Sequence, residues 1–524
     1  MSMDNVRRIA LSQNSLVRIA FLCALIFLTS CSSTPLPEHT EFTHHIGRDT
    51  ASYLQKTTTE LRADGIEEND SGFFILANPI DALVARAALI RKAEHTIDVQ
   101  YYIYKSDLTG KILVKEMLDA ADRGVRVRIL LDDFGSFGND KGLIALNAHP
   151  NVYIRLFNPF KRSGSMSLQL LTGFGKKTRR MHNKALIADN QLSIVGGRNI
   201  GDEYFGANPS VVFDDLDVLL TNPVTNDISQ VFDEFWNSSK SRPVSEKIDM
   251  SFDDEQLIQL RHNLEEELAA HQNSEYSIAI RNSRLVNKET LSEFSFRWAG
   301  CKLKADSVEK IRAERDAESL MLAPQLASLL KSLSERFIVV SPYFVPGEKG
   351  VAFFKTLRDR NVEVIVVTNS LASNDVAIVH SGYSKYRRDL IELGVKIYEI
   401  DGRDFESRPS GSLSERFASR SSLHAKYFVF DDTATFVGSF NFDPRSFYEN
   451  TEVGVSIYSS ELSQALADEV LKQLPLEAFE VTLNDKGSLQ WQLGDEIFDK
   501  EPGTSWFKRV LNVIMGWLPV ESQL

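Results

Sequence analysis

The chain has few of the features that would favour a disulfide-bonded or metal-binding protein. Its 524 residues include three cysteines, too few for a disulfide framework. Cys23 and Cys31 lie near the start of the chain, and we expect Cys301 to be an inert core thiol, because no residue type that activates a thiolate stands near it. No cluster of potential ligands is spaced for a metal site, so neither a metal nor another cofactor is expected.

Positive charge is also in deficit. The chain carries 59 Lys and Arg against 72 Asp and Glu, a formal net charge of −13. The first 30 residues hold three Arg and one Asp, so the remainder is at −15. Nucleic-acid-binding proteins need a basic surface, so we expect no nucleic-acid partner, although a local basic groove stays possible. A protein partner is left open.

Long apolar runs are missing as well. The longest, residues 19–28, follows three arginines and is too short to cross a bilayer, but it suits the apolar region of a signal peptide. Residues 28–31 (LTSC) resemble a bacterial lipobox, which would make Cys31 the lipidated N-terminus of an envelope lipoprotein. Ser32 after the cysteine favours the outer membrane over the inner. The alternatives are an ordinary signal peptide or a short uncleaved anchor.

The strongest positive feature is a repeat. Residues 181–199 read MHNKALIADNQLSIVGGRN, and residues 423–441 read LHAKYFVFDDTATFVGSFN. Six identities keep the same spacing in both copies. They are His182, Lys184, Asp189, Val195, Gly196 and Asn199 in the first, and His424, Lys426, Asp431, Val437, Gly438 and Asn441 in the second. Such internal self-similarity indicates two structurally related halves.

Each copy predicts a strand, a turn and a return strand. We expect the first strand to begin at the histidine, so that His182 and Lys184 share one face, as His424 and Lys426 do. Small residues at 196–197 and 438–439 allow the backbone to approach a ligand closely. An imidazole, an ammonium and an amide from each half suit a phosphate group, with one side chain to attack or protonate and two to hold oxygens.

The pattern resembles the HxKxxxxD signature of the phospholipase D superfamily in its two-copy form. The resemblance implies an α/β fold of two pseudo-twofold-related domains, each a mixed sheet flanked by helices, with both histidines at one site. By analogy His182 would be the nucleophile and His424 the acid and base, although the pseudo-symmetry leaves the reverse assignment open. It also implies phosphate-binding roles for Lys184, Asn199, Lys426 and Asn441.

Acidic residues complete the site expected from this resemblance. Asp189 and Asp431 belong to the catalytic signature, but we expect them to support its turn rather than touch phosphorus. Asp217 and Glu452 head probable strands and are expected to orient the catalytic imidazoles. The rival positions for that role are Asp214, Asp215 and Glu449.

Within the superfamily the chain is most similar to bacterial cardiolipin synthases of the C type, on segments such as TIDVQYYIYKSDLTG, SPYFVPGEKG and FVGSFNFDPRS. This implies a membrane enzyme that joins phosphatidylglycerol to a phosphatidyl group taken from phosphatidylethanolamine or from a second phosphatidylglycerol. A phospholipase D hydrolase is the main alternative. A nuclease is less favoured because of the charge, and a non-catalytic envelope scaffold is least favoured because both motifs are complete.

Alternating strand and helix patterns run through both halves. In chain order we expect a signal peptide (1–30), a polar tether (31–70), a first phospholipase D-like domain (71–242), a helical connecting segment (243–334), a second such domain (335–475) and a C-terminal extension with an amphipathic helix (476–524). Basic loops before the motifs, residues 161–180 and 402–420, could attract headgroups or be merely solvated. The apolar face of residues 506–518 is wide enough either for a membrane interface or for core packing.

Overall fold

The fold is described from a computed structural model, which covers residues 42–173, 175, 177–208, 212–248, 254–283, 285, 294–315, 317–374, 376–403 and 421–517. The expected signal peptide, Cys31 and residues 404–420 of the second basic loop lie outside these ranges. In the part of the chain so covered, no helix has the length and apolar character to span a bilayer.

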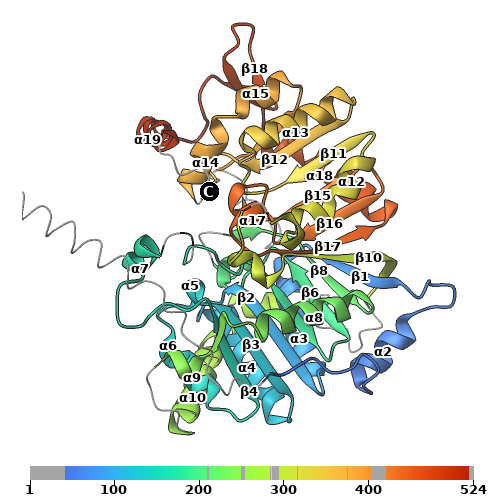
Figure 1. Cartoon of the computed structure of the whole chain (residues 1–524), viewed down its shortest axis with the longest axis vertical. Helices are drawn as coiled ribbons and strands as arrows, with labels where there is room; N and C mark the ends of the chain where they lie inside the picture. Colours follow the sequence, from blue (N-terminus) through green and yellow to red (C-terminus); the bar gives the residue numbers. More distant parts are fainter. Residues whose placement is uncertain are drawn as a thin grey trace, which may run out of the picture. The chain divides into compact units, whose positions relative to one another are not determined.

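The two halves repeat one strand order (Figure 1). In the first half, three parallel strands lie beside an antiparallel series. The order is β4 (Val152–Phe157), β3 (Arg126–Asp132), β2 (Thr96–Ile103), β5 (Ala185–Ala188), β6 (Leu192–Gly196), β8 (Asp217–Thr221) and β1 (Asp70–Leu76). Strand β9 (Ser241–Pro243) pairs with the outer edge of β4.

The second half follows the same order. It runs β13 (Lys396–Ile400), β12 (Glu363–Asn369), β11 (Arg336–Val340), β15 (Tyr427–Phe430), β16 (Ala434–Gly438), β17 (Val453–Tyr458) and β10 (Arg297–Ala305). Strand β10 also pairs with β1, so the halves share one sheet, which has 18 strands in the described ranges. The outer edge of β13 extends through β18 (Ala478–Leu483), β19 (Leu489–Leu493) and β20 (Glu496–Phe498).

The apolar side chains form three cores. Alternate residues of each strand face opposite sides of the sheet, and helices cover the apolar side chains there. One core lies between the first half of the sheet and helices α3 (Pro79–Lys92) and α4 (Leu108–Asp122). The middle core joins the halves and contains α8 (Val224–Trp236) and α18 (Ser460–Glu477). The third packs α13 (Gly347–Asp359) and α14 (Ala377–Ser384) on the second half. The predicted two-domain α/β fold is therefore present.

Local differences from the expectations have physical reasons. The connecting segment contains helices α10 (Asp254–His271) and α11 (Glu275–Arg281), but also strand β10, whose apolar pattern is broken by lysines because it is only partly buried. In the second half two helices, α14 and α15 (Arg387–Glu392), stand between β12 and β13.

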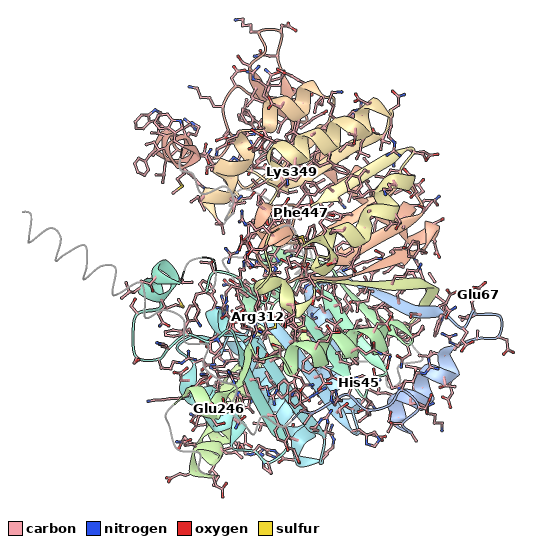
Figure 2. All side chains as sticks on the ribbon, viewed as in Figure 1. His45, Glu67, Glu246, Arg312, Lys349 and Phe447 are labelled. Atoms are coloured by element: carbon pink, nitrogen blue, oxygen red, sulfur yellow. The ribbon has the colours of Figure 1, made fainter. Side chains whose placement is uncertain are left out.

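The polar tether is shorter than expected. From His44 onward the chain packs on the first half, where Figure 2 labels His45. His45 Nδ1 lies 2.7 Å from Asp233 Oδ2. The backbone oxygens of Ile46 and Arg48 accept hydrogen bonds from Asn190 and Gln191 of the first motif's turn. Helix α2 (Tyr53–Leu61) follows in the same segment.

Candidate active site

Both motif histidines sit where one half touches the other. The His182 backbone NH donates to Thr451 O at 2.9 Å, and the His424 backbone NH donates to Asp214 O at 2.7 Å. Contrary to expectation, neither histidine lies in a strand, because β5 begins at Ala185 and β15 at Tyr427. Their backbone NH groups are bonded to the opposite half, and Asp214 is the last residue of β7 (Val212–Asp214), which pairs in parallel with β14 (Ser421–Leu423) just before His424.

The imidazole of His182 is oriented by Glu452. His182 Nδ1 lies 2.8 Å from Glu452 Oε2, and both side chains are buried. Glu452 is itself held by the hydroxyl of Ser439, in the small pair of the second motif, and by that of Ser446 at 3.0 Å. With Nδ1 turned to the carboxylate, Nε2 is the nitrogen that faces a substrate.

The imidazole of His424 is oriented by Asp215, not by Asp217. His424 Nδ1 lies 2.6 Å from Asp215 Oδ2. Asp217 instead pairs with Arg86 at 2.8 Å and Arg198 at 3.3 Å inside the first half. The choice of Asp217 was wrong because that residue starts β8, and its side chain faces the helix α3 side, whereas Asp215 precedes the strand.

Gly197 makes the approach of Asp215 possible. A Cβ added at Gly197 would come within 2.1 Å of Asp215 Oδ1, and one at Gly196 equally close to Asp217 Oδ1. The glycine pair was expected to give room for a ligand; it gives room for carboxylates that support the site. In the second motif Ser439 occupies the equivalent place and hydrogen-bonds the carboxylate there.

Two lysines bring positive charge to the histidines. Lys184 Nζ donates to His182 O at 2.7 Å, and Lys426 Nζ lies 2.8 Å from His424 Nδ1. Burial lowers the pKa of Lys184 to about 7, an effect that Glu452 partly opposes and Lys426 reinforces. The charge of each lysine also lowers the pKa of the histidine in the other half, so the two motifs form one electrostatic site.

The environment lowers the pKa of both histidines. Burial, and then the charges of Lys184 and Lys426, hold the pKa of His182 well below its usual value. Burial and Lys426 lower the pKa of His424 to about 4 despite the attraction of Asp215.

The carboxylates differ. Burial raises the pKa of Glu452 to about 7. Burial also acts to raise the pKa of Asp215, but Lys426 and His424 outweigh it and hold the pKa below its usual value. A protonated imidazole is therefore better stabilised at His424 than at His182.

The two motif asparagines are placed differently from each other. The Asn199 amide accepts from Ile103 NH at 3.2 Å and donates to Tyr204 OH at 2.9 Å, so it supports the ring that lies edge-on to His424. Asn441 is buried, and its side-chain oxygen accepts no hydrogen bond from the described residues. Of the two, Asn441 is the one whose amide is better placed to meet a polar ligand.

Asp189 and Asp431 stand at the far end of their strands from the histidines. Asp189 accepts from the backbone NH groups of residues 94–96, and Asp431 from those of residues 334–336. Both have a positive φ in the turn that joins the two motif strands. They fix the start of β2 and β11, respectively, which is a structural role.

Two residues that sequence reasoning did not single out hold the motifs in register. The NH of Met181 donates to Asp132 Oδ2 at 2.9 Å, and the NH of Leu423 donates to Asn369 Oδ1 at 3.1 Å. Asp132 and Asn369 end the equivalent strands β3 and β12, so their polar character at the carboxyl end of an apolar strand was the available signal.

The first basic loop is less available to a headgroup than expected. Arg162 pairs with Asp133 and Asp140, Arg179 with Glu449, and Arg180 with Asp132. These guanidinium groups are used to hold the loop.

Comparison with known proteins identifies the family. A family model described as cardiolipin synthase, PLD-like domain, matches residues 87–236 and 326–474, one match in each half. The chain belongs to the phospholipase D superfamily. It is a phospholipase D-type phosphatidyltransferase, and the resemblance noted in the sequence is confirmed.

Individual relatives agree with the family. The chain is 38% identical to cardiolipin synthase C of Escherichia coli (strain K12), over 86% of this chain and 95% of that protein. It is 25% identical to a cardiolipin synthase of Geobacillus kaustophilus (strain HTA426), over 76% of this chain and 65% of that protein. The structure of a phosphatidylserine synthase of Haemophilus influenzae Rd KW20 matches with a TM-score of 0.56 at 14% identity, covering 90% of this chain and 100% of that one, which supports the shared fold.

Proposed function

We propose that this phosphatidyltransferase makes cardiolipin, transferring a phosphatidyl group to phosphatidylglycerol through a phosphatidyl-histidine. The observation that carries the mechanism is the crossed pairing of each histidine with a carboxylate of the other half. Two supported imidazoles in one site can divide nucleophilic attack and proton transfer between them. The 38% identity to cardiolipin synthase C supports the choice of acceptor.

In the first step His182 attacks. Its Nε2 lone pair forms the bond to phosphorus, the bond from phosphorus to the headgroup oxygen breaks, and that oxygen takes a proton from His424. Asp215 stabilises the protonated His424 that this step requires, which favours His424 as the acid. Lys184, Lys426 and Asn441 hold the phosphoryl oxygens.

In the second step the acceptor replaces the enzyme. The hydroxyl of phosphatidylglycerol gives its proton to His424, its oxygen bonds to phosphorus, and the bond from phosphorus to Nε2 breaks. Water can attack the same intermediate, so exclusion of water decides between cardiolipin and phosphatidic acid.

Lipid analysis tests this assignment. The chain, or its His182→Ala variant as control, is expressed in a bacterial strain that lacks cardiolipin. We expect cardiolipin only with the unmodified chain. Phosphatidic acid without cardiolipin would indicate a hydrolase instead.

The donor is tested separately in mixed micelles of labelled phosphatidylglycerol and unlabelled phosphatidylethanolamine. Release of ethanolamine identifies phosphatidylethanolamine as the donor, and release of glycerol identifies a second phosphatidylglycerol.

A further inference from the structure

Helix α19 (Trp506–Gly516) turns its apolar side outward. Trp506 is 71% exposed, Phe507 is 68% exposed and Trp517, which caps the helix, is 80% exposed. The residue of this helix that is fully buried is Asn512. A helix packed on a core buries its apolar residues and exposes its polar ones. Of the two interpretations of the sequence, core packing and a membrane interface, the structure therefore favours the one with an outward-facing apolar surface.

This surface is continuous. At 100° per residue, six side chains fall within a sector of about 120°, and no polar residue shares it. They are Trp506, Phe507, Val510, Val513, Ile514 and Trp517. A contiguous apolar patch that is exposed on a protein surface marks a binding surface.

Polar contacts fix the other side of the helix to the protein. Asn512 Nδ2 donates to Ser384 Oγ at 3.4 Å, and Lys508 Nζ donates to Ala372 O at 3.4 Å. Just before the helix, Glu501 pairs with the buried Arg387 at 2.8 Å. The helix is therefore held in a set orientation with its apolar side free of these contacts.

The helix is also close to the second motif. Ala372 lies in the loop between β12 and α14, and the next residue, Ser373, accepts a hydrogen bond at 2.9 Å through its backbone oxygen from Ser422 Oγ. Ser422 is two residues before His424. Figure 1 shows α19 beside α14, and the two helices are in contact.

We propose that α19 is an interfacial membrane helix that inserts its apolar side into the bilayer and sets the rim of the second motif on the lipid surface. Such helices carry tryptophan and phenylalanine on the apolar face and polar residues on the other. In α19 the polar face is the one held to the protein. The choice of a bilayer over a second copy of the chain rests on the proposed function, because a phosphatidyl donor and acceptor both reside in the bilayer.

Tryptophan quenching by bilayer lipids tests the proposal. The chain has five tryptophans, none in residues 1–41, so an N-terminal anchor gives no signal. Trp236 and Trp491 are buried. The full chain carrying Cys31→Ala is mixed with vesicles of phosphatidylethanolamine and phosphatidylglycerol whose acyl chains are brominated. We expect quenching that disappears in the Trp506→Phe/Trp517→Phe variant.

A matched pair of variants gives the affinity. Phe507→Gln/Ile514→Gln keeps both reporter tryptophans, and Ile258→Gln/Leu476→Gln removes two apolar side chains elsewhere that are at least half exposed, as Phe507 and Ile514 are. The first should weaken the vesicle titration roughly tenfold, and the second should leave it unchanged. Absence of quenching in the parent chain, or equal titrations of the two variants, would overturn the proposal. So would a dimer in light scattering that the first variant abolishes, since a second copy would then cover α19.

A soluble substrate separates this proposal from the proposed function. On short-chain phospholipids below their micelle concentration, Phe507→Gln/Ile514→Gln should transfer as fast as the parent. If the parent transfers nothing on any lipid, the proposed function is wrong, while the quenching still decides whether α19 meets the bilayer.

Discussion

His182 Nδ1 lies 2.8 Å from Oε2 of Glu452, a residue 270 positions further along the chain. The relationship is reciprocal, because His424 takes its carboxylate, Asp215, from the first half. Each half thus supplies an imidazole to its own motif and a carboxylate to the other. Neither half can form a complete site alone, and the shared sheet and core hold the two halves together.

Removal of either histidine should abolish transfer. His182→Ala and His424→Ala should each reduce kcat by more than roughly 10³-fold, because one removes the covalent intermediate and the other the proton transfer. Turnover of phosphatidylglycerol by purified protein is the measurement. Substantial activity in either variant, or recovery on mixing the two, would contradict one two-histidine site within a chain.

Asp215 and Asp217 should give opposite phenotypes. Asp215→Asn removes the charge that stabilises protonated His424, so kcat should fall roughly 10²–10⁴-fold with little change in thermal stability. Asp217→Asn leaves the buried Arg86 and Arg198 without their counter-charge, so the free energy of unfolding should drop by about 3–5 kcal/mol. Steady-state kinetics and denaturant unfolding of both variants check this. The reverse pattern would restore Asp217 as the orienting residue.

The activity should fall on the alkaline side of neutrality. In the proposed mechanism Lys184 binds phosphate when it is protonated. Burial lowers its pKa to about 7, so its charge is lost as the pH rises through that value. We expect kcat/KM on a short-chain phospholipid to decline above about pH 7. In Lys184→Arg the charge persists, so the part of this decline that Lys184 causes should disappear even though the absolute rate is lower. An unchanged alkaline limb in that variant would exclude Lys184 as its source.

Chelation should leave the reaction intact. The groups expected to hold phosphate are ammonium and amide groups, and the described residues contain no group of three or more His, Cys, Asp or Glu able to hold a metal ion. Transfer in excess EDTA should match the untreated rate. Loss of activity that a divalent cation restores would contradict this site.

Cys31 should carry a lipid. The Cys31→Ala variant should lose incorporation of a fatty-acid probe in cells and shift toward the soluble fraction. The control, Ser32→Ala, should keep both the label and its membrane fraction. Unchanged labelling would contradict the lipobox. Continued membrane binding without label would fit a contribution from α19.

The sequence by itself determined the family, the twofold repeat and the alternation of strands and helices, because these depend on local spacing. His182, Lys184, His424 and Lys426 are recognisable from six fixed identities. The turns at Asp189 and Asp431 follow from residue type, since Asp and Asn tolerate the positive φ found there.

Only the tertiary structure decided the relationships between distant segments. Whether Asp215 or Asp217 reaches His424 depends on where β8 begins and on the face to which each side chain points. The two residues are only two positions apart, so the sequence alone cannot decide between them. The place of β10 between the halves depends on unpaired edges of two sheets. The orientation of α19 depends on which side finds partners on the protein, because an apolar sector of the same width suits either a core or a bilayer.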